Sequence, residues 1–320
     1  MSFLNDNTIS AEMQAIFEEN AAEIAKRVTI KDKTADHYKI IHTENTFRNF
    51  KDCGHQIGFD EQGNIVQANF CKHRFCTVCN KRNSSRKWHY IKEIAEVINK
   101  TVAPQWLFLT VTIKNPSAEE LKQSINHLME SINRMFSTKT WKKRVLGFFR
   151  SLEITYNSED NTYHPHYHIL IAVPHDYYTN ENIYMSAYEW RKLWEKSARL
   201  EYNSQVKIEG VQSGDNLSNA IAEVAKYAVK MSAIMEQDEK ALEPVANAVR
   251  GRRLISYGGI IKEQYKVEKS KDLTADEIRN KTVYFYNYVP QLEQYIPDFV
   301  SNPSAENLYK HETVNKIDDS

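Results

Sequence analysis

The pattern of apolar and polar residues predicts helices and strands in a mixed order. Apolar side chains spaced by three and four predict helices over residues 11–27, 83–100, 117–136 and 217–235, and another around Trp190 and Trp194. Runs rich in β-branched and aromatic residues predict strands over residues 107–113, 145–156, 163–173 and 206–208, with extended segments at 252–260 and 282–289. The order predicts an α+β fold, with a mainly antiparallel sheet after residue 100 and a more helical module before it.

The composition indicates a sizeable core and argues against two classes of enzyme. Of the 320 residues, 41% are hydrophobic, yet the longest apolar run, 106–113, is far shorter than the roughly 18 residues that span a membrane. The chain does not open with a basic stretch and an apolar block, so we expect a cytoplasmic protein with no membrane partner. Only 9 glycines occur and none forms a phosphate-binding loop, which argues against ATP-driven motors and dinucleotide enzymes.

Charge is balanced overall but unevenly distributed. Lysine and arginine total 42, as do aspartate and glutamate, so the net charge is zero. Two blocks, residues 72–92 and 134–150, contain basic residues and no acidic ones. A charged block is usually only a solvated face, although basic residues interleaved with aromatic ones also suit nucleic acid.

All four cysteines fall between residues 53 and 79, at Cys53, Cys71, Cys76 and Cys79. Disulfides are disfavoured in the cytoplasm, and clustered thiolates with a Cys-x-x-Cys pair suit tetrahedral Zn²⁺. We therefore predict a structural zinc site made of the four cysteines, although His55 and His73 are near enough in sequence to replace one of them. The overlapping basic block is predicted to contact DNA through Lys72, Arg74, Lys81, Arg82, Arg86 and Lys87.

A second candidate metal site involves two neighbouring predicted strands. His166 and His168 alternate along one strand and therefore point to the same face, where two imidazoles can chelate one divalent ion. A hairpin turn centred on residues 159–160 places Glu153 opposite His166, and a shift of one residue places it opposite His168. Either register gives three ligands with open positions, which suits Mn²⁺ or Mg²⁺ holding a phosphate and does not exclude Zn²⁺. His164 shares this face in a supporting or packing role.

The predicted helix over residues 217–235 groups a carboxylate, a phenol and an ammonium. At about 100° per residue, Glu223, Tyr227 and Lys230 fall on a stripe about 60° wide, beside an apolar stripe. A tyrosine packed at the edge of the core beside an ion pair would give the same pattern. Near a metal that polarises a phosphodiester, however, a tyrosine can form a covalent phosphotyrosine, and the lysine can stabilise the phenolate or phosphate charge.

Together these motifs resemble the plasmid rolling-circle replication initiators of the HUH endonuclease superfamily, in the class with one catalytic tyrosine. The resemblance spans residues 50–265. It rests on six segments in family order: FCKHRFCTVC at 70–79, FLTVT at 108–112, SLE at 151–153, HPHYH at 164–168, KYAVK at 226–230 and YGG at 257–259.

The resemblance implies an antiparallel sheet with flanking helices that nicks plasmid origin DNA at a single-stranded or hairpin site. Tyr227 would attack one strand, remain on the 5′ phosphate and free a 3′ hydroxyl as primer, with Lys226 and Lys230 beside it. The two histidines and Glu153 would hold the Mn²⁺ or Mg²⁺ ion. Glu223 would activate water at termination. Because the chain lacks an ATPase motif, a host helicase would unwind the DNA.

The sequence therefore predicts three parts. Residues 1–100 form a helical, zinc-binding and DNA-contacting module, residues 101–265 the HUH nicking and joining domain, and residues 266–320 a C-terminal segment with a disordered tail. A zinc-braced, sequence-specific DNA-binding protein without catalysis would explain the cysteines and basic blocks but not the other motifs together. A phosphodiesterase that uses water alone, and an HUH transposase or relaxase, also remain open.

Overall fold

The computed structural model describes residues 11–41, 43–60, 65–212, 214–225, 239–269 and 284–297. The tail predicted to be disordered lies outside these residues. The chain divides into two compact units, one formed by the described residues up to 80 together with 284–297, the other by the described residues from 81 to 269. These bounds differ from the three predicted parts, because strands from the C-terminal segment pair with a strand that lies before residue 60. No helix in the described ranges is long and apolar enough to cross a membrane.

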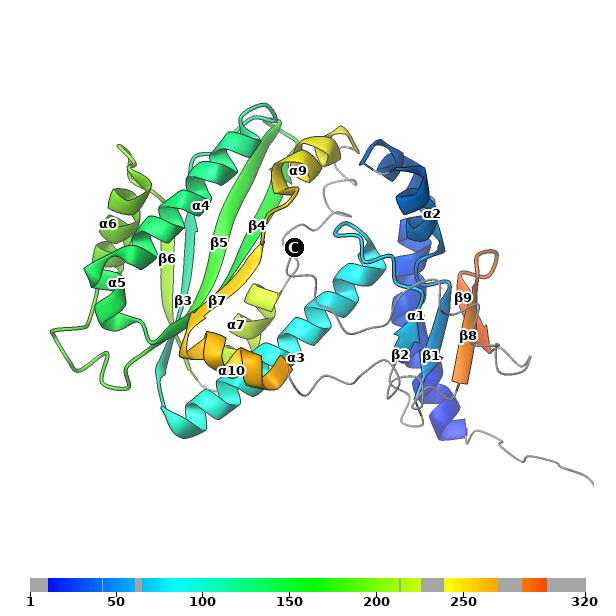
Figure 1. The fold of residues 1–320 in the computed structure, drawn as a ribbon, viewed down its shortest axis with the longest axis horizontal. Coiled ribbons are helices and arrows are strands. Elements are labelled where there is room, and N and C mark those ends of the chain that lie inside the picture. Colours follow the sequence, from blue (N-terminus) through cyan, green and yellow to red (C-terminus); the bar gives the residue numbers. More distant parts are fainter. Residues whose placement is uncertain are drawn as a thin grey trace, which may run out of the picture. The chain divides into compact units, whose positions relative to one another are not determined.

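The first unit packs helices against a four-stranded antiparallel sheet (Figure 1). Its helices are α1 (Ala11–Lys33), the 3-10 helix η1 (Ala35–Ile41) and α2 (Glu44–Asp52). Its strands in spatial order are β2 (Ile65–Ala68), β1 (Gln56–Phe59), β8 (Tyr284–Val289) and β9 (Gln294–Pro297). Phe17 of α1 lies on this sheet, with its ring 5.0 Å from that of Phe59 and 6.0 Å from that of Tyr286. The first unit is therefore less purely helical than the sequence predicted.

The second unit is a five-stranded antiparallel sheet with helices on both faces. The strands in spatial order are β6 (Val206–Val211), β3 (Gln105–Thr112), β5 (Thr162–Val173), β4 (Gly147–Asn157) and β7 (Ile255–Gly259). The helices are α3 (Thr77–Thr101, whose first four residues belong to the first unit), α4 (Leu121–Ser137), α5 (Lys139–Arg144), α6 (Ala187–Ala198), α7 (Asp215–Ala225), η2 (Glu239–Ala241), α9 (Leu242–Val249) and α10 (Ile260–Lys269). The predicted α+β class with an antiparallel sheet and flanking helices is confirmed.

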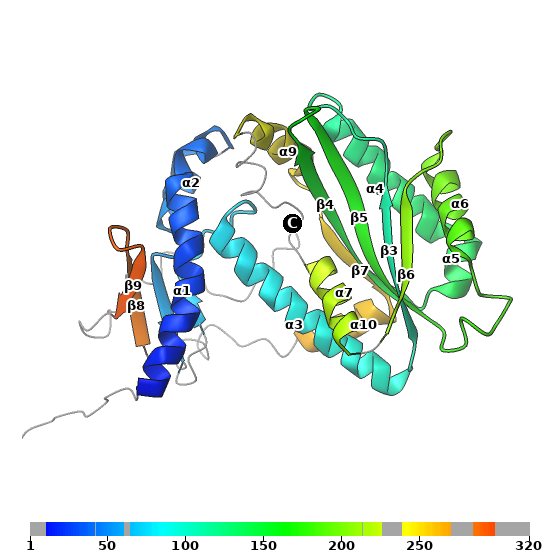
Figure 2. The same ribbon diagram turned by 180° about the vertical axis from the view of Figure 1, so that it is seen from behind.

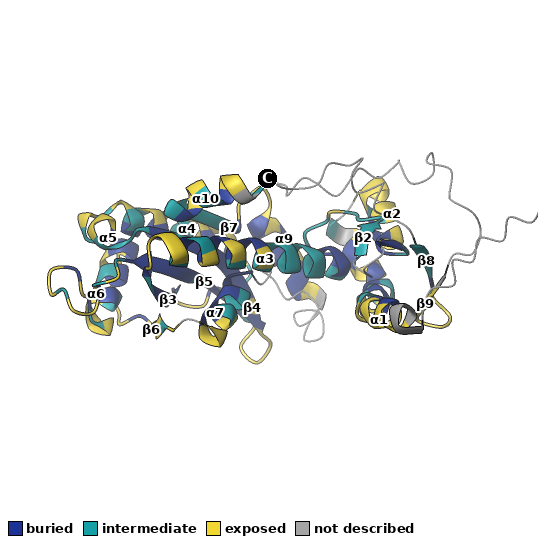
Figure 3. Cartoon of the chain, turned by 90° about the horizontal axis from the view of Figure 1, so that it is seen from below, coloured by how far each residue is buried: buried dark blue, intermediate teal, exposed yellow. Residues whose placement is uncertain are grey.

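The two faces of this sheet carry different helices. Figure 1 shows α4, α5, α6 and α9 on one face, and Figure 2, from behind, shows α3 and α7 on the other. Central strand β5 is almost wholly buried between the layers, and residues 169–173 are all buried (Figure 3). The core of this unit therefore fixes the register of β5, because a slip by one residue would turn its polar side chains into the opposite layer.

The hairpin of β4 and β5 has the first of the two registers considered from the sequence. Glu153 pairs with His166, and Asn157 pairs with Thr162, so the turn is centred between residues 159 and 160. Asn161 completes the turn with a left-handed backbone (φ 53°), a conformation that asparagine tolerates better than most residues.

Candidate active site and metal centres

The two histidines and the glutamate predicted to bind a catalytic ion converge on one point of the sheet. Oε2 of Glu153 lies 3.2 Å from Nε2 of His166 and 2.9 Å from Nε2 of His168, and the two Nε2 atoms are 3.1 Å apart. An octahedral ion with bonds of about 2.1 Å separates adjacent ligand atoms by about 3.0 Å. The three donor atoms therefore fit one face of the coordination shell of a single divalent ion.

The rings of both histidines are oriented by their second nitrogen atoms. Nδ1 of His166 lies 3.0 Å from the carbonyl oxygen of His164, and because a carbonyl only accepts, Nδ1 carries a proton. In the neutral imidazole, which is the form that binds a metal, Nε2 then presents a lone pair. Nδ1 of His168 lies 3.1 Å from the hydroxyl oxygen of Thr110 on β3. The ring of Phe108 stacks on His168, with centroids 5.5 Å apart. Such contacts fix the orientation of metal-binding imidazoles.

The site is partly shielded from solvent and keeps its carboxylate ionised. The side chains of Glu153 and His166 are each 10% exposed, and that of His168 is 14% exposed. Burial acts to raise the pKa of Glu153, but hydrogen bonds with His166 and His168 outweigh it and hold the pKa well below its usual value. The charged form of the carboxylate, which a cation needs, is therefore the stable one at neutral pH.

The helix that carries Glu223 packs against the strands of this site. α7 contacts β4 and β5, and the residues of its apolar stripe in the described part, Leu217, Ile221 and Val224, are all buried. Glu223 lies on the neighbouring stripe and is half-buried. The other predicted members of this group, Lys226, Tyr227 and Lys230, lie outside the described residues, and their arrangement stays a prediction.

The four cysteines form a compact cluster in the first unit. The sulfur of Cys53 lies 3.5 Å from the sulfurs of Cys76 and Cys79, and that of Cys71 lies 3.7 Å from Cys79. A disulfide would bring two sulfurs to about 2.05 Å, whereas a tetrahedral Zn²⁺ ion with bonds of about 2.3 Å separates them by about 3.8 Å. The spacing therefore matches a metal site with four thiolate ligands.

Backbone conformation and burial support the cluster. The N–H groups of Cys71 and His73 donate to the sulfurs of Cys53 and Cys71, at 3.3 and 3.4 Å. Gly54 has a φ of +82°, and a Cβ there would lie 2.9 Å from Val28, so the turn beside Cys53 needs glycine. Burial, and then contact with the other thiols, raises the pKa of Cys53, so four thiolates need a bound cation to balance their charge.

The two histidines considered as alternative ligands contact other groups. Nε2 of His55 lies 2.9 Å from Oδ2 of Asp32, and Nδ1 of His73 accepts the N–H of Phe75 at 3.3 Å. Among the described residues, the thiol cluster consists of cysteines alone. The arrangement favours a ligand set of four cysteines over one that includes either histidine.

The predicted DNA-contacting residues fall on two segments. Lys72 and Arg74 lie in the loop between Cys71 and Cys76, in the first unit. The others lie on the first turns of α3, in the second unit: Lys81, Arg82, Arg86 and Lys87. Their contact with DNA stays a prediction.

Comparison with known proteins identifies the family. A family model described as "Replication protein" matches residues 62–293, well over half of the chain. The chain belongs to the replication protein family. The resemblance to plasmid replication initiators inferred from the motifs is therefore confirmed, and the assignment to the HUH superfamily and its class with one catalytic tyrosine stays a prediction.

Relatives within the replication protein family cover most of the chain. It is 34% identical over 239 residues to "Protein rep" of Streptococcus pneumoniae serotype 2 (strain D39 / NCTC 7466), which covers 72% of this chain and 75% of that protein. The chain is 36% identical over 242 residues to "Protein rep" of Lactiplantibacillus plantarum, an alignment that covers 71% of this chain and 75% of that protein. It is 34% identical over 255 residues to "Protein rep" of Lentilactobacillus hilgardii, with 75% of this chain and 81% of that protein covered. No solved structure gives a significant match.

Two further residues beside the metal-binding group, Thr110 and Phe108, lie in the motif FLTVT at 108–112, and the motif itself indicates no role for either. The signal that identifies them is the strand pairing, because Thr110 lies directly beside His168 and Phe108 beside Leu170, two pairs further along and therefore on the same face. That register becomes visible only once β3 is known to pair with β5.

Proposed function

We propose that this protein initiates rolling-circle replication of a plasmid by nicking one strand of the origin DNA with HUH-type chemistry. The observation that carries the proposal is the convergence of three metal-binding atoms from Glu153, His166 and His168 on paired strands, in a member of the replication protein family. The nicking domain corresponds to residues 101–265, and the origin offers the nick site as a single strand or hairpin.

Each group of the proposed site has a separate role in the transesterification. A bound Mn²⁺ or Mg²⁺ ion supplies Lewis-acid polarisation of the scissile phosphate. Tyr227 attacks the phosphorus through its phenolic oxygen while the bond to the 3′ oxygen breaks. The phenol loses its proton, the departing 3′ oxygen gains one, and the products are a 5′-phosphotyrosine and a free 3′ hydroxyl. Lys226 and Lys230 stabilise the phenolate or phosphate charge.

Glu223 acts at termination in this proposal. It precedes Tyr227 by four residues, which is about one helical turn, so on a continuing helix both side chains reach the same phosphate. As a general base, Glu223 takes a proton from water while the oxygen of that water displaces the tyrosine. The described part of α7 supports this role because it packs on β4 and β5, the strands of the metal-binding group.

The thiol cluster has a structural role. Cys53, Cys71, Cys76 and Cys79 hold Zn²⁺, which braces the loop that carries Lys72 and Arg74 and the start of α3. These residues, with Lys81, Arg82, Arg86 and Lys87, bind origin DNA through its phosphates. The partner that separates the strands is a host helicase, and replication takes place in the cytoplasm.

Metal-dependent cleavage tests this function. Labelled single-stranded oligonucleotides that tile the DNA around the gene are incubated with Mn²⁺, with the wild type and with Glu153→Ala. We expect site-specific cleavage by the wild type that chelation abolishes, and at least a hundredfold slower cleavage by the variant. Glu209→Ala, on the edge strand β6, is the matched control and should cleave normally. Sequence-specific binding without cleavage by any divalent ion would instead favour the non-catalytic DNA-binding protein.

A further inference from the structure

The proposed function leaves one basic block without a role. Residues 131–152 contain six basic side chains and no acidic one. They lie at the end of α4, on α5 and at the start of β4: Arg134, Lys139, Lys142, Lys143, Arg144 and Arg150. Arg150 alternates with Glu153 along β4 and contacts Asn133 of α4, so the block lies on the sheet face opposite the metal-binding group.

The charge of this block is poorly neutralised. Lys139, Lys142 and Lys143 are exposed and form no ion pair with any residue in the described ranges. Arg144 donates to the carbonyl oxygens of Ile183 and Thr140. The ion pair that Arg134 forms with Glu130 is loose, at 3.6 Å. The surface therefore keeps a concentrated positive charge in a chain whose net charge is zero.

Arg150 is held in place by neutral groups. Its guanidinium lies 5.3 Å from the ring centroid of Phe136 and 5.2 Å from that of Tyr167. It donates to the hydroxyl of Ser256 at 2.6 Å and to the side-chain oxygen of Asn133 at 3.3 Å. No carboxylate among the described residues pairs with it. A guanidinium that is oriented but not neutralised is suited to an external phosphate.

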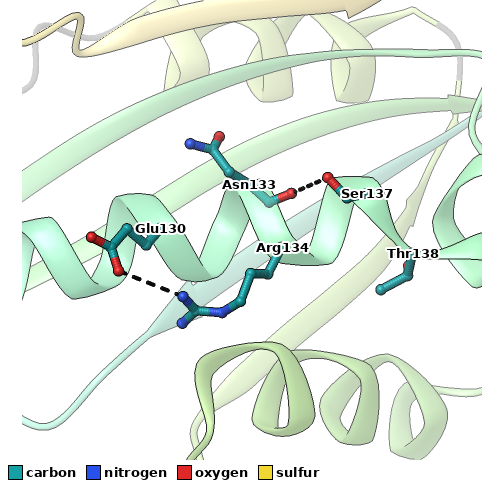
Figure 4. A pocket seen from close by; sticks show the side chains of 5 residues that line it. All are labelled: Glu130, Asn133, Arg134, Ser137 and Thr138. Atoms are coloured by element: carbon teal, nitrogen blue, oxygen red, sulfur yellow. Dashed lines mark hydrogen bonds and ion pairs between the residues drawn. The ribbon is translucent and has the colours of Figure 1, made fainter.

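A shallow hollow links these basic groups. It has a volume of about 510 Å³ and lies along the outer side of α4, lined by Glu130, Asn133, Arg134, Ser137 and Thr138 (Figure 4). At one side Asn133 contacts Arg150, and at the C-terminal end Thr138 leads directly into Lys139. Glu130 is the one carboxylate among the lining residues, and it forms the ion pair with Arg134 described above. We call the hollow together with the exposed lysines of α5 the α4–α5 surface.

The aromatic residues of the block favour a duplex over a single strand. Trp141 is 4% exposed and Phe149 is 1% exposed, so their rings belong to the core. Phe136 is half-buried and stacks on Trp141 at 4.2 Å. Non-specific binding of single strands relies on exposed rings on which bases stack, whereas binding of a duplex backbone needs cations alone.

From the α4–α5 surface we infer a second DNA-binding site, which takes the phosphate backbone of double-stranded DNA on the sheet face opposite the group formed by Glu153, His166 and His168. This inference rests on the proposed function, because it gives the duplex beside the nick site a place on the same domain. The contacts are electrostatic and independent of base sequence.

Two triple variants of the full chain test the inference. The α5 variant, Lys139→Gln/Lys142→Gln/Lys143→Gln, removes the exposed lysines of the surface. Lys100→Gln/Lys122→Gln/Lys262→Gln removes three exposed lysines from α3, the start of α4 and α10, so both variants change the net charge equally. The affinity for a short fluorescent duplex and for a single strand of the same sequence is measured over a series of salt concentrations, alongside thermal unfolding and cleavage of single-stranded oligonucleotides.

The α5 variant should lose at least about tenfold in duplex affinity, and the slope of log K against log salt should fall by about 2 to 3, because each lost phosphate contact removes about 0.9 from it. The control variant should change duplex affinity by less than half as much on a logarithmic scale. Unchanged cleavage of single strands by both variants keeps the proposed function separate from this test. Three results would overturn the inference. The two variants could lose duplex affinity equally, or the α5 variant could lose single-strand affinity as much as duplex affinity. The α5 variant could also show a lower melting temperature without a change in duplex affinity. The last result would mean that these lysines only stabilise the end of α5.

Discussion

The hydroxyl oxygen of Thr110 lies 3.1 Å from Nδ1 of His168, and the two residues are directly paired across β3 and β5. When Nδ1 donates to this oxygen, Nε2 is left free to bind a cation. Under the proposed function Thr110 is therefore a positioning residue, which would act on a bound ion through the imidazole of His168. Thr110→Val keeps the shape of the side chain and removes the oxygen, so it should weaken Mn²⁺ binding by about tenfold, as loss of a hydrogen bond to a metal-binding histidine typically does. Isothermal titration with Mn²⁺ measures this directly.

Thr110→Ser is the matched control, because it keeps the oxygen and loses only a methyl group. It should bind Mn²⁺ with nearly the affinity of the wild type. If the serine and valine variants lost affinity equally, packing rather than the hydrogen bond would orient His168.

The thiol cluster predicts a dependence of stability on zinc. Cys76→Ser should lower the zinc content of the purified protein from about one equivalent and reduce its melting temperature, because binding of a structural metal contributes to the free energy of folding. Elemental analysis and thermal unfolding measure the two effects. His73→Ala lies in the same loop and should retain zinc, because Nδ1 of its ring accepts the N–H of Phe75 and the group of possible ligands among the described residues consists of cysteines alone. Loss of zinc in His73→Ala would mean that the ligand set includes this histidine.

Asp32 predicts a dependence of stability on pH. Burial acts to raise its pKa, but hydrogen bonds with His55 and with the fully buried Lys31 outweigh it and lower the pKa. A carboxyl group whose pKa is lowered on folding stabilises the protein above its unfolded pKa, and this stabilisation is lost as pH falls through the lowered value. Asp32→Asn should reduce the free energy of unfolding by about 3 kcal/mol at pH 7, because it leaves the Lys31 ammonium without its counter-charge.

The difference between wild type and Asp32→Asn should begin to narrow as pH falls below about 4, where the carboxyl group of the unfolded chain is protonated. It should disappear only when pH has fallen through the lowered pKa of the folded protein. Urea unfolding over a pH series measures this difference. Any loss of metal in acid affects both proteins, so the difference isolates the carboxylate. If the difference in free energy of unfolding did not narrow in acid, the loss of stability in Asp32→Asn would come from the changed packing of the side chain and not from its charge.

The proposed role of Glu223 predicts that nicking and release of the covalent complex respond differently to its substitution. Glu223→Ala should nick DNA at nearly the wild-type rate but release the covalent complex at least about tenfold more slowly, because general-base catalysis contributes that much or more. A time course of adduct formation and decay measures both rates. An equal loss in both steps would show that Glu223 supports the site as a whole and does not act on water.

The candidate site was more predictable than the fold around it. Alternation along a strand is a local property, so the sequence placed His166 and His168 on one face, and the short polar turn limited Glu153 to two registers. Contacts between segments that are distant in sequence could not be predicted from such local patterns. Asp32 pairs with His55, which removes that histidine from the candidate zinc ligands, and nothing near Cys53 in the sequence indicates it.

Two predictions were wrong, one because a neighbouring side chain competes for the Ser117 hydroxyl and the other because the pairing strands are far apart in sequence. The sequence predicted a helix over residues 117–136, and the spacing of Ser117 and Glu120 is that of a capping box. Glu120 does accept the N–H of Ser117 at 3.3 Å, but the Ser117 hydroxyl donates to Glu119, and α4 begins only at Leu121. The sheet of the first unit was missed because β1 and β2 are four residues long and β1 pairs with β8, more than 220 residues later.

The central claim, a covalent tyrosine intermediate at the Glu153–His166–His168 group, is tested most directly by locating the bond itself. The wild type is incubated with Mn²⁺ and the cleaved oligonucleotide, the complex is digested, and mass spectrometry identifies the peptide that carries the 5′ phosphate. The account predicts a single modified residue, Tyr227, and no adduct with Tyr227→Phe or after chelation of the metal. Cleavage that persists in Tyr227→Phe, or an adduct on another residue, would contradict it.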